Sequence, residues 1–166
     1  RKYIGRLLGF AFISEVIFDK TFFGTFFYPL YQNVFFTLLI GLFMLVSVDF
    51  LRGHMLTELR IINYILEGVI VILCCGLAYY LRCDYSMYGI LMIYWFYALR
   101  FNKILMALFE AYTNLQLIGG TQIYAVFALI PIYMYNGEKG NEKYKWWFYA
   151  YYPLHLLVIC VIKTAI

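Results

Sequence analysis

The sequence predicts an all-α protein, a polytopic transmembrane helical bundle with about seven spans. Apolar residues make up 65% of the 166 residues, which is more than one compact soluble domain of that length could bury. Charged residues make up only 13%, whereas soluble chains carry about 25%. This composition argues against a disordered chain, a secreted disulfide scaffold and a nucleic-acid-binding protein.

Seven apolar runs lie between clusters of Gly, Pro, Asn and charged residues. A helical span of the hydrocarbon core needs about 20 mostly apolar residues. In chain order the runs are Tyr3–Phe18, Asn33–Leu51, Leu59–Leu81, Tyr85–Leu99, Lys103–Ile118, Gly120–Tyr135 and Trp146–Thr164.

The second, third and seventh runs have a full spanning length, and the other four are short for crossing alone. These four need aromatic or basic ends that reach the interface, or a place inside the bundle. Only Gly119 and Gly120 separate the fifth run from the sixth, so these two can also form one re-entrant or tilted pair.

The distribution of Lys and Arg predicts the orientation, because cytoplasmic loops of membrane proteins are enriched in both. With seven crossings, ten basic residues fall on the side of the N-terminus and three, Lys20, Arg82 and Lys163, on the other. The ten are Arg1, Lys2, Arg6, Arg52, Arg60, Arg100, Lys103, Lys139, Lys143 and Lys145. We therefore expect a cytoplasmic N-terminus and an outside C-terminus, and the net charge of +4 needs no anionic partner to explain it.

The four cysteines, Cys74, Cys75, Cys83 and Cys160, have no spacing typical of a metal site or a redox motif. We interpret them as small hydrophobic residues and expect no metal. The chain begins at Arg1 without a signal peptide, so we expect a preceding segment.

Three ionisable residues, Glu67, Glu110 and His155, fall about 10–14 Å into their runs, at 1.5 Å per residue. Charges at this depth are costly and often functional. Asn63 and Asn114 each lie four residues from a glutamate, on the same helical face. A buried carboxyl beside His155 could form an ion pair or orient a general base. The alternative is that these groups only hydrogen-bond one another and join helices.

His155 has the strongest case for chemistry among the three. Pro153, two residues earlier, removes the hydrogen bond to the carbonyl of Tyr149 and leaves a free acceptor near the imidazole. Irregular backbone at membrane depth is tolerated where it is buried or lines a water-filled cavity.

A second polar group is expected near the outer face. Glu15 and Asp19 are one helical turn apart, Gln32 and Asn33 open the second run, and Asp84 precedes the fourth. These residues form an acidic rim that suits a polar or cationic acceptor, or they form a solvated edge.

Arg6 lies at the opposite, cytoplasmic end of the first run. It sets the topology, or it meets an anionic donor such as a nucleotide phosphate. The polar loop of residues 136–143 lies on the same predicted side and is the longest soluble connection.

The ordered blocks of this sequence resemble the TraX family over nearly the whole chain. The blocks are Arg6–Glu15 continuing to Phe18-Asp19, Gln32–Thr37, Asp84–Gly89, Tyr135–Gly140 with Phe148, and Tyr152–Leu157. The resemblance implies one integral-membrane domain over residues 1–166, in the inner membrane of a bacterium. The family is named after a conjugation-pilus factor that acetylates the pilin N-terminus, and it is similar to membrane acyltransferases that use cytoplasmic acetyl-CoA.

The chain differs from the family at its start. TraX-like proteins usually begin with two further spans, which carry an Asp-His pair and an Arg-rich boundary with a Pro-Phe segment. Neither is present here, and in related acyltransferases a histidine of an early span is a leading catalytic candidate. Two additional spans would leave the N-terminus of this chain on the cytoplasmic side.

The resemblance implies an acetyltransferase that moves acetyl from acetyl-CoA to an amine or hydroxyl on a protein N-terminus, a glycan or a small molecule. His155, Glu67 and Glu110 are the catalytic candidates. The donor would meet Arg6, Asn136, Lys139 and Lys143, and the acceptor would meet Glu15, Asp19, Asn33 and Asp84. Two alternatives remain: a proton-coupled transporter or flippase that uses Glu67, Glu110 and His155 as a relay, and a non-catalytic membrane scaffold.

Overall fold

The computed structural model describes residues 2–54, 60–118, 120–138 and 142–165, and no strand occurs in these ranges. The all-α fold class is therefore confirmed. Each of the seven predicted runs coincides with a helical segment. The elements are α1 (Lys2–Phe23), α2 (Val34–Gly53), α3 (Arg60–Tyr80), α4 (Ser86–Ala98), α5 (Lys103–Tyr112), η1 (Thr113–Ile118), η2 (Gly120–Ala128), α6 (Leu129–Met134), η3 (Glu142–Tyr144) and α7 (Lys145–Ala165).

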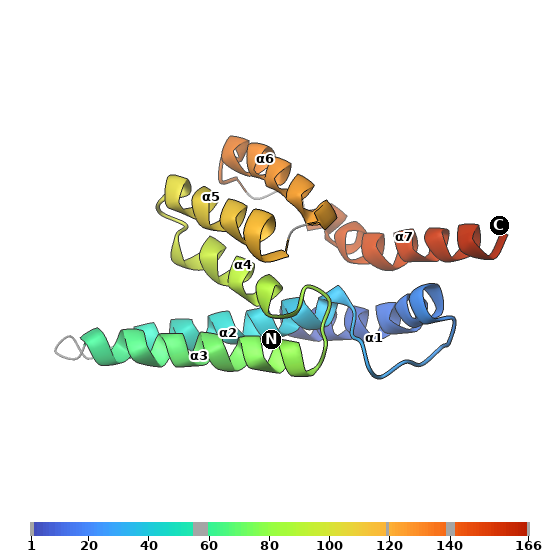
Figure 1. Ribbon diagram of the computed structural model, residues 1–166, viewed down its shortest axis with the longest axis horizontal. Helices are drawn as coiled ribbons and strands as arrows, with labels where there is room; N and C mark the ends of the chain where they lie inside the picture. Colours follow the sequence, from blue (N-terminus) through green and yellow to red (C-terminus); the bar gives the residue numbers. More distant parts are fainter. Residues whose placement is uncertain (1, 55–59, 119, 139–141, 166) are drawn as a thin grey trace.

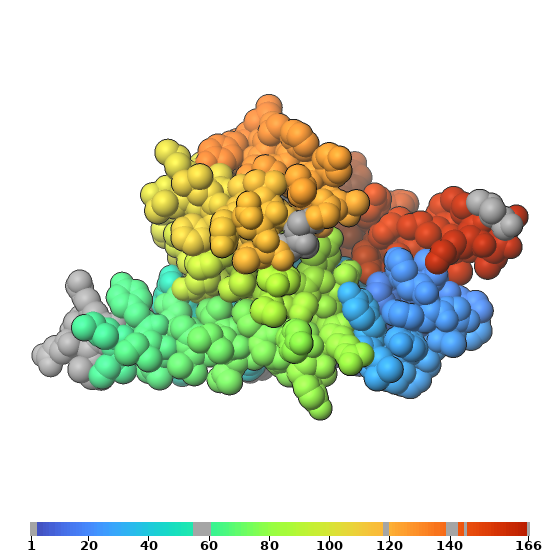
Figure 2. All heavy atoms as spheres, viewed as in Figure 1, coloured from blue at the N-terminus to red at the C-terminus, as the bar shows by residue number. Residues whose placement is uncertain are grey.

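The helices form two tiers. The long helices α1, α2 and α3 lie side by side, and α7 lies along α1 at one end of the molecule (Figure 1). α4 packs against α2 and α3, and α5, η1, η2 and α6 follow it in a second tier. Figure 2 shows this second tier rising from the layer of long helices, with α7 and the end of α1 together on one side.

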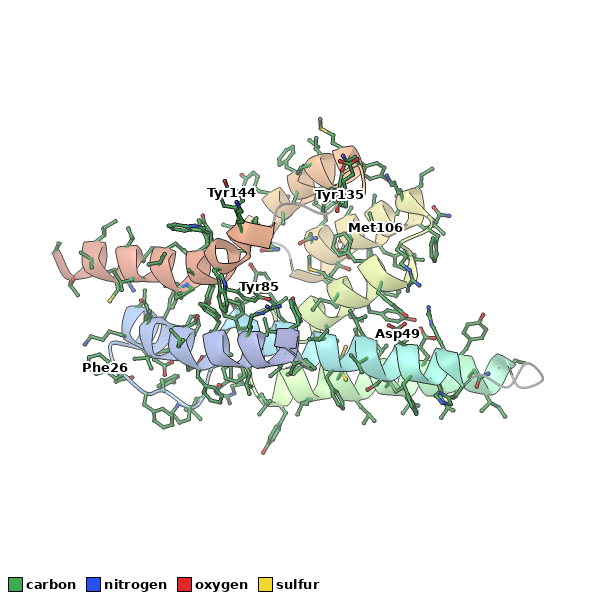
Figure 3. The ribbon with its side chains drawn as sticks, turned by 180° about the vertical axis from the view of Figure 1, so that it is seen from behind. Phe26, Asp49, Tyr85, Met106, Tyr135 and Tyr144 are labelled. Atoms are coloured by element: carbon green, nitrogen blue, oxygen red, sulfur yellow. The ribbon has the colours of Figure 1, made fainter. Side chains whose placement is uncertain are left out.

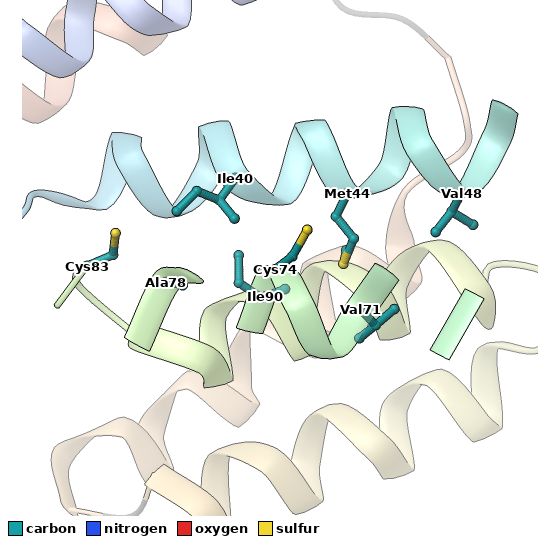
Figure 4. Packing of buried hydrophobic residues seen from close by; sticks show 8 residues of the cluster. All are labelled: Ile40, Met44, Val48, Val71, Cys74, Ala78, Cys83 and Ile90. Atoms are coloured by element: carbon teal, nitrogen blue, oxygen red, sulfur yellow. The ribbon is translucent and has the colours of Figure 1, made fainter. Parts of the chain in front are cut away.

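The hydrophobic core lies between α2, α3 and α4. Core residues recur every three or four positions on α2 and α3, so they lie on one face of each helix. They are Ile40, Met44, Val48, Val71, Cys74, Ala78, Cys83 and Ile90 (Figure 4). Gly41 allows α4 to approach α2 closely, because a Cβ at this position would lie 2.3 Å from Cδ1 of Ile93.

Within the described ranges, three helices have the length and the hydropathy to cross a membrane: Val34–Gly53, Ile61–Tyr80 and Trp146–Ala165. α4 has only 13 residues and α5 only 10. α1 has 22 residues but carries Arg6, Glu15, Asp19 and Lys20. The protein therefore has membrane-like helices, but seven crossings are not shown. Apolar side chains such as Phe43 and Ile72 are 65% and 71% exposed, and lipid would cover them in a membrane.

The fifth and sixth runs differ from the regular helices that the sequence predicts. The fifth changes from α-helix to π-helix at Thr113, and the sixth begins as a 3₁₀-helix before α6. The 3₁₀ rise of about 2.0 Å per residue exceeds the α rise of about 1.5 Å, so the sixth run reaches roughly 27 Å. Gly120, with φ of +58°, lies where the chain turns between the two runs.

α1 and α7 run in the same direction. Arg6 lies over the ring of Trp146 near the start of both helices, and Thr21 contacts Leu156 and Lys163 farther along. Seven alternating crossings would give this relation between the first helix and the last. Which end faces the cytoplasm stays a prediction.

Candidate functional site

The end of α1 and the loop that follows it form an acidic cleft of about 350 Å³. Glu15 and Asp19 lie one turn apart on α1 and both line it. The other lining residues are mostly aromatic or apolar: Phe12, Val16, Phe26, Phe27, Tyr28, Pro29, Gln32 and Phe36. Figure 3 shows Phe26 on the loop beyond α1. Carboxylates among aromatic rings suit a cationic or polar ligand.

Asn33 holds Glu15 in place. The Asn33 side chain donates to Glu15 Oε2 at 2.5 Å and to the carbonyl of Ala11 at 2.8 Å, and its main-chain N–H donates to the same carboxylate oxygen at 3.1 Å. Its side-chain oxygen also accepts from Phe35 N–H at 2.9 Å, so Asn33 is the N-cap of α2. One residue thus fixes both the start of α2 and the orientation of the Glu15 carboxylate.

Asp19 keeps one carboxylate oxygen without a partner. The side chain is 1% exposed, and Oδ2 accepts from the Tyr28 N–H at 2.7 Å. Oδ1 has no hydrogen-bond partner among the described residues. A buried acceptor with unused capacity is the kind of group that a ligand donor can satisfy.

Asp84 lies beside the cleft on the α3–α4 turn rather than inside it. This turn is joined to the loop before α2, because Gln32 N–H donates to Arg82 O at 3.2 Å and Asp84 N–H donates to Gln32 O at 2.8 Å. The Thr37 hydroxyl donates to the carbonyl of Asp84. Burial raises the pKa of the Asp84 carboxyl, while a hydrogen bond from the Tyr85 N–H opposes that shift.

The same turn stores backbone strain. Arg82, Tyr85 and Ser86 all have positive φ, between 47° and 63°, although none is a glycine. Strain of this kind is common at functional sites. Burial also raises the pKa of the neighbouring Cys83 thiol to about 11, so this cysteine stays protonated and unreactive.

Tyr152 of α7, which had no predicted role, packs against Phe35 near the start of α2. Its hydroxyl is close enough to the main-chain N–H of Val34 and to the carboxyls of Asp84 and Glu15 to interact with them electrostatically. Its ring packs against Phe35 and against His155, with centroids 5.2 Å apart in each case. Its place directly before Pro153, in a block that resembles the TraX family, was the available signal in the sequence.

His155 does not meet the buried glutamates. Its Nδ1 lies 3.2 Å from the carbonyl of Tyr151, one turn back on α7, and its ring stacks on Tyr151. α7 continues as a helix through the buried Pro153. The acceptor beside the imidazole is the carbonyl of Tyr151, whereas the carbonyl of Tyr149 was expected there. His155 also lines an apolar groove of about 620 Å³ along α7.

Glu67 is an ion-pair partner within the core. It is 2% exposed, and Arg52 of α2 binds it at 2.5 and 3.0 Å. The Tyr94 hydroxyl of α4 donates to the same carboxylate at 2.9 Å. The structure therefore pairs the Glu67 carboxylate with a guanidinium of the neighbouring helix, and no contact joins it to His155 among the described residues.

Glu110 is buried alone. It is 1% exposed at the end of α5, and neither carboxyl oxygen has a hydrogen-bond partner among the described residues. Asn114 lies on the same face, as the spacing predicts, but its amide donates to the main-chain carbonyl of Glu110 at 2.8 Å.

Arg6 lines a groove of about 520 Å³ at the other end of the α1–α7 pair. The guanidinium lies 6.0 Å from the Trp146 ring centroid and 5.8 Å from that of Tyr149. Its buried Nε has no hydrogen-bond partner among the described residues. Gly5 and Gly9 leave the adjacent surface open, since a Cβ at either position would meet no atom within 4 Å.

The structure describes two of the other three residues expected at the donor site, Lys143 and Asn136. Lys143 lies in η3, directly before α7 and three residues from Trp146. Asn136 shapes its own turn, because its side-chain oxygen accepts from the Glu138 N–H at 3.0 Å. Lys139 lies outside the described residues.

No group of three or more His, Cys, Asp or Glu side chains that could hold a metal ion occurs in the described ranges. The four cysteines are free thiols, two of them buried.

A family model described as TraX protein matches residues 1–163. No curated protein and no solved structure is significantly similar to the chain.

Proposed function

The chain belongs to the TraX family, and we propose that it is an integral-membrane acetyltransferase that moves acetyl from cytoplasmic acetyl-CoA to an acceptor amine or hydroxyl. The observation that carries the proposal is the presence of two unlike sites along α1. A basic groove at Arg6 lies near the start of α1, where α7 contributes Trp146, and the acidic cleft at Glu15 and Asp19 lies toward its end, where the following loop and α2 complete it.

The donor would bind at the basic groove. Arg6 offers a guanidinium with an unsatisfied N–H beside an open surface, which suits a phosphate group of CoA. Lys143 adds positive charge near the start of α7, and Asn136 and Lys139 belong to the loop before it. Arg6 and Gly9 lie near the N-terminal end of α1, which is cytoplasmic in the predicted orientation.

The acceptor would bind in the acidic cleft. Asp19 Oδ1 is free to accept from an amine or a hydroxyl, and Asn33 fixes the second carboxylate, that of Glu15. The aromatic walls favour an amine over a hydroxyl, because a positive or partly positive nitrogen interacts well with ring faces. Asp84 would contribute to the acceptor site from the adjacent α3–α4 turn.

Arg6 and Glu15 are nine residues apart on α1, which is about 14 Å along the helix axis. The acetyl thioester would therefore have to extend along the α1–α7 pair toward the cleft. The acceptor atom would attack the thioester carbonyl carbon, the C–S bond would break, and the proton lost by the acceptor would reach the departing thiolate.

His155 is the candidate general base in this chain, with Tyr152 between it and the acidic turn. A general base of this kind contributes about 10²–10⁴-fold in rate. Glu67 is left out of the proposed chemistry, because Arg52 and Tyr94 already bind its carboxylate.

Binding of acetyl-CoA to the purified chain in nanodiscs tests the donor site. Arg6→Ala should weaken binding about 10-fold to 100-fold, since a hydrogen bond to a charged group contributes about 1.5–3 kcal/mol. Arg100→Ala is the matched control, because Arg100 lies on the α4–α5 turn against Tyr97 and Phe101, away from the groove. Equal affinities for the two variants would remove Arg6 from the donor site.

The alternative, a proton-coupled transporter or flippase, is favoured by one observation, the buried and unpartnered carboxyl of Glu110. It predicts substrate uptake into proteoliposomes that depends on a pH gradient, without binding of acetyl-CoA.

A further inference from the structure

Glu110 is a buried acid that the proposed acetyl transfer does not use. It lies on α5 three residues before the π-helix η1, it is 1% exposed, and both carboxyl oxygens lack a partner among the described residues. A buried carboxylate in this state would lack any compensation for its lost hydration.

The polar side chains nearest in sequence and structure are committed to other acceptors. The Thr113 hydroxyl donates to the carbonyl of Phe109 at 2.8 Å. The Asn114 amide donates to the main-chain carbonyl of Glu110 at 2.8 Å, and the Gln122 amide donates to Asn114 Oδ1 at 3.2 Å. The donors that could solvate an anion here thus bond to main-chain or amide oxygens instead.

The elements around Glu110 supply no counter-charge. α4, which packs on α5 and η1, carries no Asp, Glu, Lys, Arg or His, and η1 and η2 carry none either. On α5 itself, Lys103 is exposed and seven residues away, about 10 Å along the axis. The remaining ionisable groups on these elements and on α6 are the tyrosines Tyr88, Tyr94, Tyr97, Tyr112, Tyr124 and Tyr133.

Neutral phenols cannot cancel the charge of an anion, and three of these tyrosines already donate hydrogen bonds to other acceptors. Tyr94 donates to Glu67, Tyr97 donates to Asp49 of α2, and Tyr133 donates to the carbonyl of Lys103. Tyr112 and Tyr124 are 55% and 70% exposed.

We propose that Glu110 is a proton-binding site, a carboxylic acid held in its neutral form within the α5–η1 segment. The proton removes the charge that no neighbouring group compensates.

Proton release at this site is linked to the packing of the segment. An ionised Glu110 needs water or a new donor, and neither can reach a side chain that is 1% exposed unless α5 or η1 moves. The π-helix begins at Thr113, and π-helical turns are frequent at functional positions. Ionisation of Glu110 should therefore favour an open arrangement of α5 and η1.

Labelling with dicyclohexylcarbodiimide tests the proposal, because this lipophilic reagent reacts with protonated carboxylic acids. The whole chain in nanodiscs is labelled across a pH series, and the modified residues are located by peptide mass spectrometry. Glu110 should react roughly tenfold or more faster than Glu67, because Arg52 and Tyr94 already bind the Glu67 carboxylate while both Glu110 oxygens lack a partner among the described residues. The Glu110 rate should fall as pH rises.

Two variants and a salt control complete the test. Glu110→Gln should lose the label, while Glu67→Gln should keep it on Glu110. The rate should be the same in sodium chloride and in choline chloride, since the proposed ligand is a proton. Protection by sodium would assign a metal cation in its place, and equal labelling of the two glutamates would overturn the proposal.

Infrared spectroscopy of the unmodified chain gives a readout that does not depend on access by the reagent. The carbonyl stretch of a protonated carboxylic acid should be present near neutral pH in the wild type and lost in Glu110→Gln. Its absence from the wild type would overturn the proposal. Neither measurement depends on acetyl transfer, so failure here and failure of the proposed function are distinguishable.

Discussion

The α2–α3–α4 core and the α5–η1 segment each bury one glutamate, and they compensate its charge in different ways. Glu67 receives a guanidinium from α2 and a phenol from α4, so its carboxylate joins three helices. Glu110 receives no such group among the described residues. Burial alone therefore does not assign a role to a carboxyl in a membrane protein, because its neighbours decide whether it is a structural anion or a proton site.

Glu67→Gln should give the largest loss of stability. It leaves Arg52 without its counter-charge, and breaking a buried pair costs about 3–5 kcal/mol. Arg52 is 32% exposed, so we expect about 2–3 kcal/mol. Unfolding in detergent measures this loss, and the double variant Arg52→Met with Glu67→Met should recover most of it. A loss for Glu67→Gln below about 1 kcal/mol would show that the pair is not structural.

Tyr94→Phe should give an intermediate loss of about 1.5 kcal/mol, because it removes one hydrogen bond to a charged group and leaves the ion pair intact. Tyr124→Phe is the matched control, since Tyr124 is 70% exposed. The same unfolding assay applies. Equal effects of the two substitutions would contradict the role of Tyr94.

Glu110→Gln should change the free energy of unfolding by less than about 1 kcal/mol, because the amide replaces a neutral acid of similar shape. Hydrogen exchange in η1 is a second measurement that distinguishes the wild type from Glu110→Gln. In the wild type, exchange should rise with pH beyond the intrinsic chemical dependence, and in the variant only the intrinsic dependence should remain. If the exchange rate in the variant depends on pH as it does in the wild type, Glu110 does not control the opening of the α5–η1 segment.

Asp84→Asn should give the smallest effect, a gain below about 0.5 kcal/mol near neutral pH. Burial raises the pKa of Asp84 above its unfolded value of about 3.9, so the wild type loses stability as pH rises through the folded pKa. The two proteins should therefore be equally stable below about pH 3.9 and should diverge above it. Melting temperatures across a pH series measure the difference, and a variant less stable at neutral pH contradicts the assignment.

The positions of the helices were predictable from the sequence. The predicted run Asn33–Leu51 becomes Val34–Gly53, and Tyr85–Leu99 becomes Ser86–Ala98, because apolar runs bounded by polar residues also bound the hydrogen-bonded segment. The helix type of Thr113–Ile118 and Gly120–Ala128 was not predictable, since π and 3₁₀ winding depend on tertiary packing more than on local composition.

Part of the candidate site was also predictable. The expected acidic group near the end of α1 is brought together, with Glu15 and Asp19 in one cleft and Asn33 bonded to Glu15. The partner of Glu67 was not predictable, because Arg52 lies fifteen residues away on another helix and the register across the α2–α3 turn decides the contact. Tyr152 was missed because its contact with Phe35 joins α7 to α2, which are far apart in the sequence.

Transfer of a labelled acetyl group from acetyl-CoA by the purified chain in nanodiscs is the decisive test of the proposed acetyltransferase. We expect transfer to an added primary amine and a rate about 10²–10⁴-fold lower in His155→Ala. Unchanged transfer in His155→Ala would remove this residue from the chemistry. Absence of transfer and of acetyl-CoA binding, together with uptake driven by a pH gradient in proteoliposomes, would contradict the acetyltransferase and support the transporter.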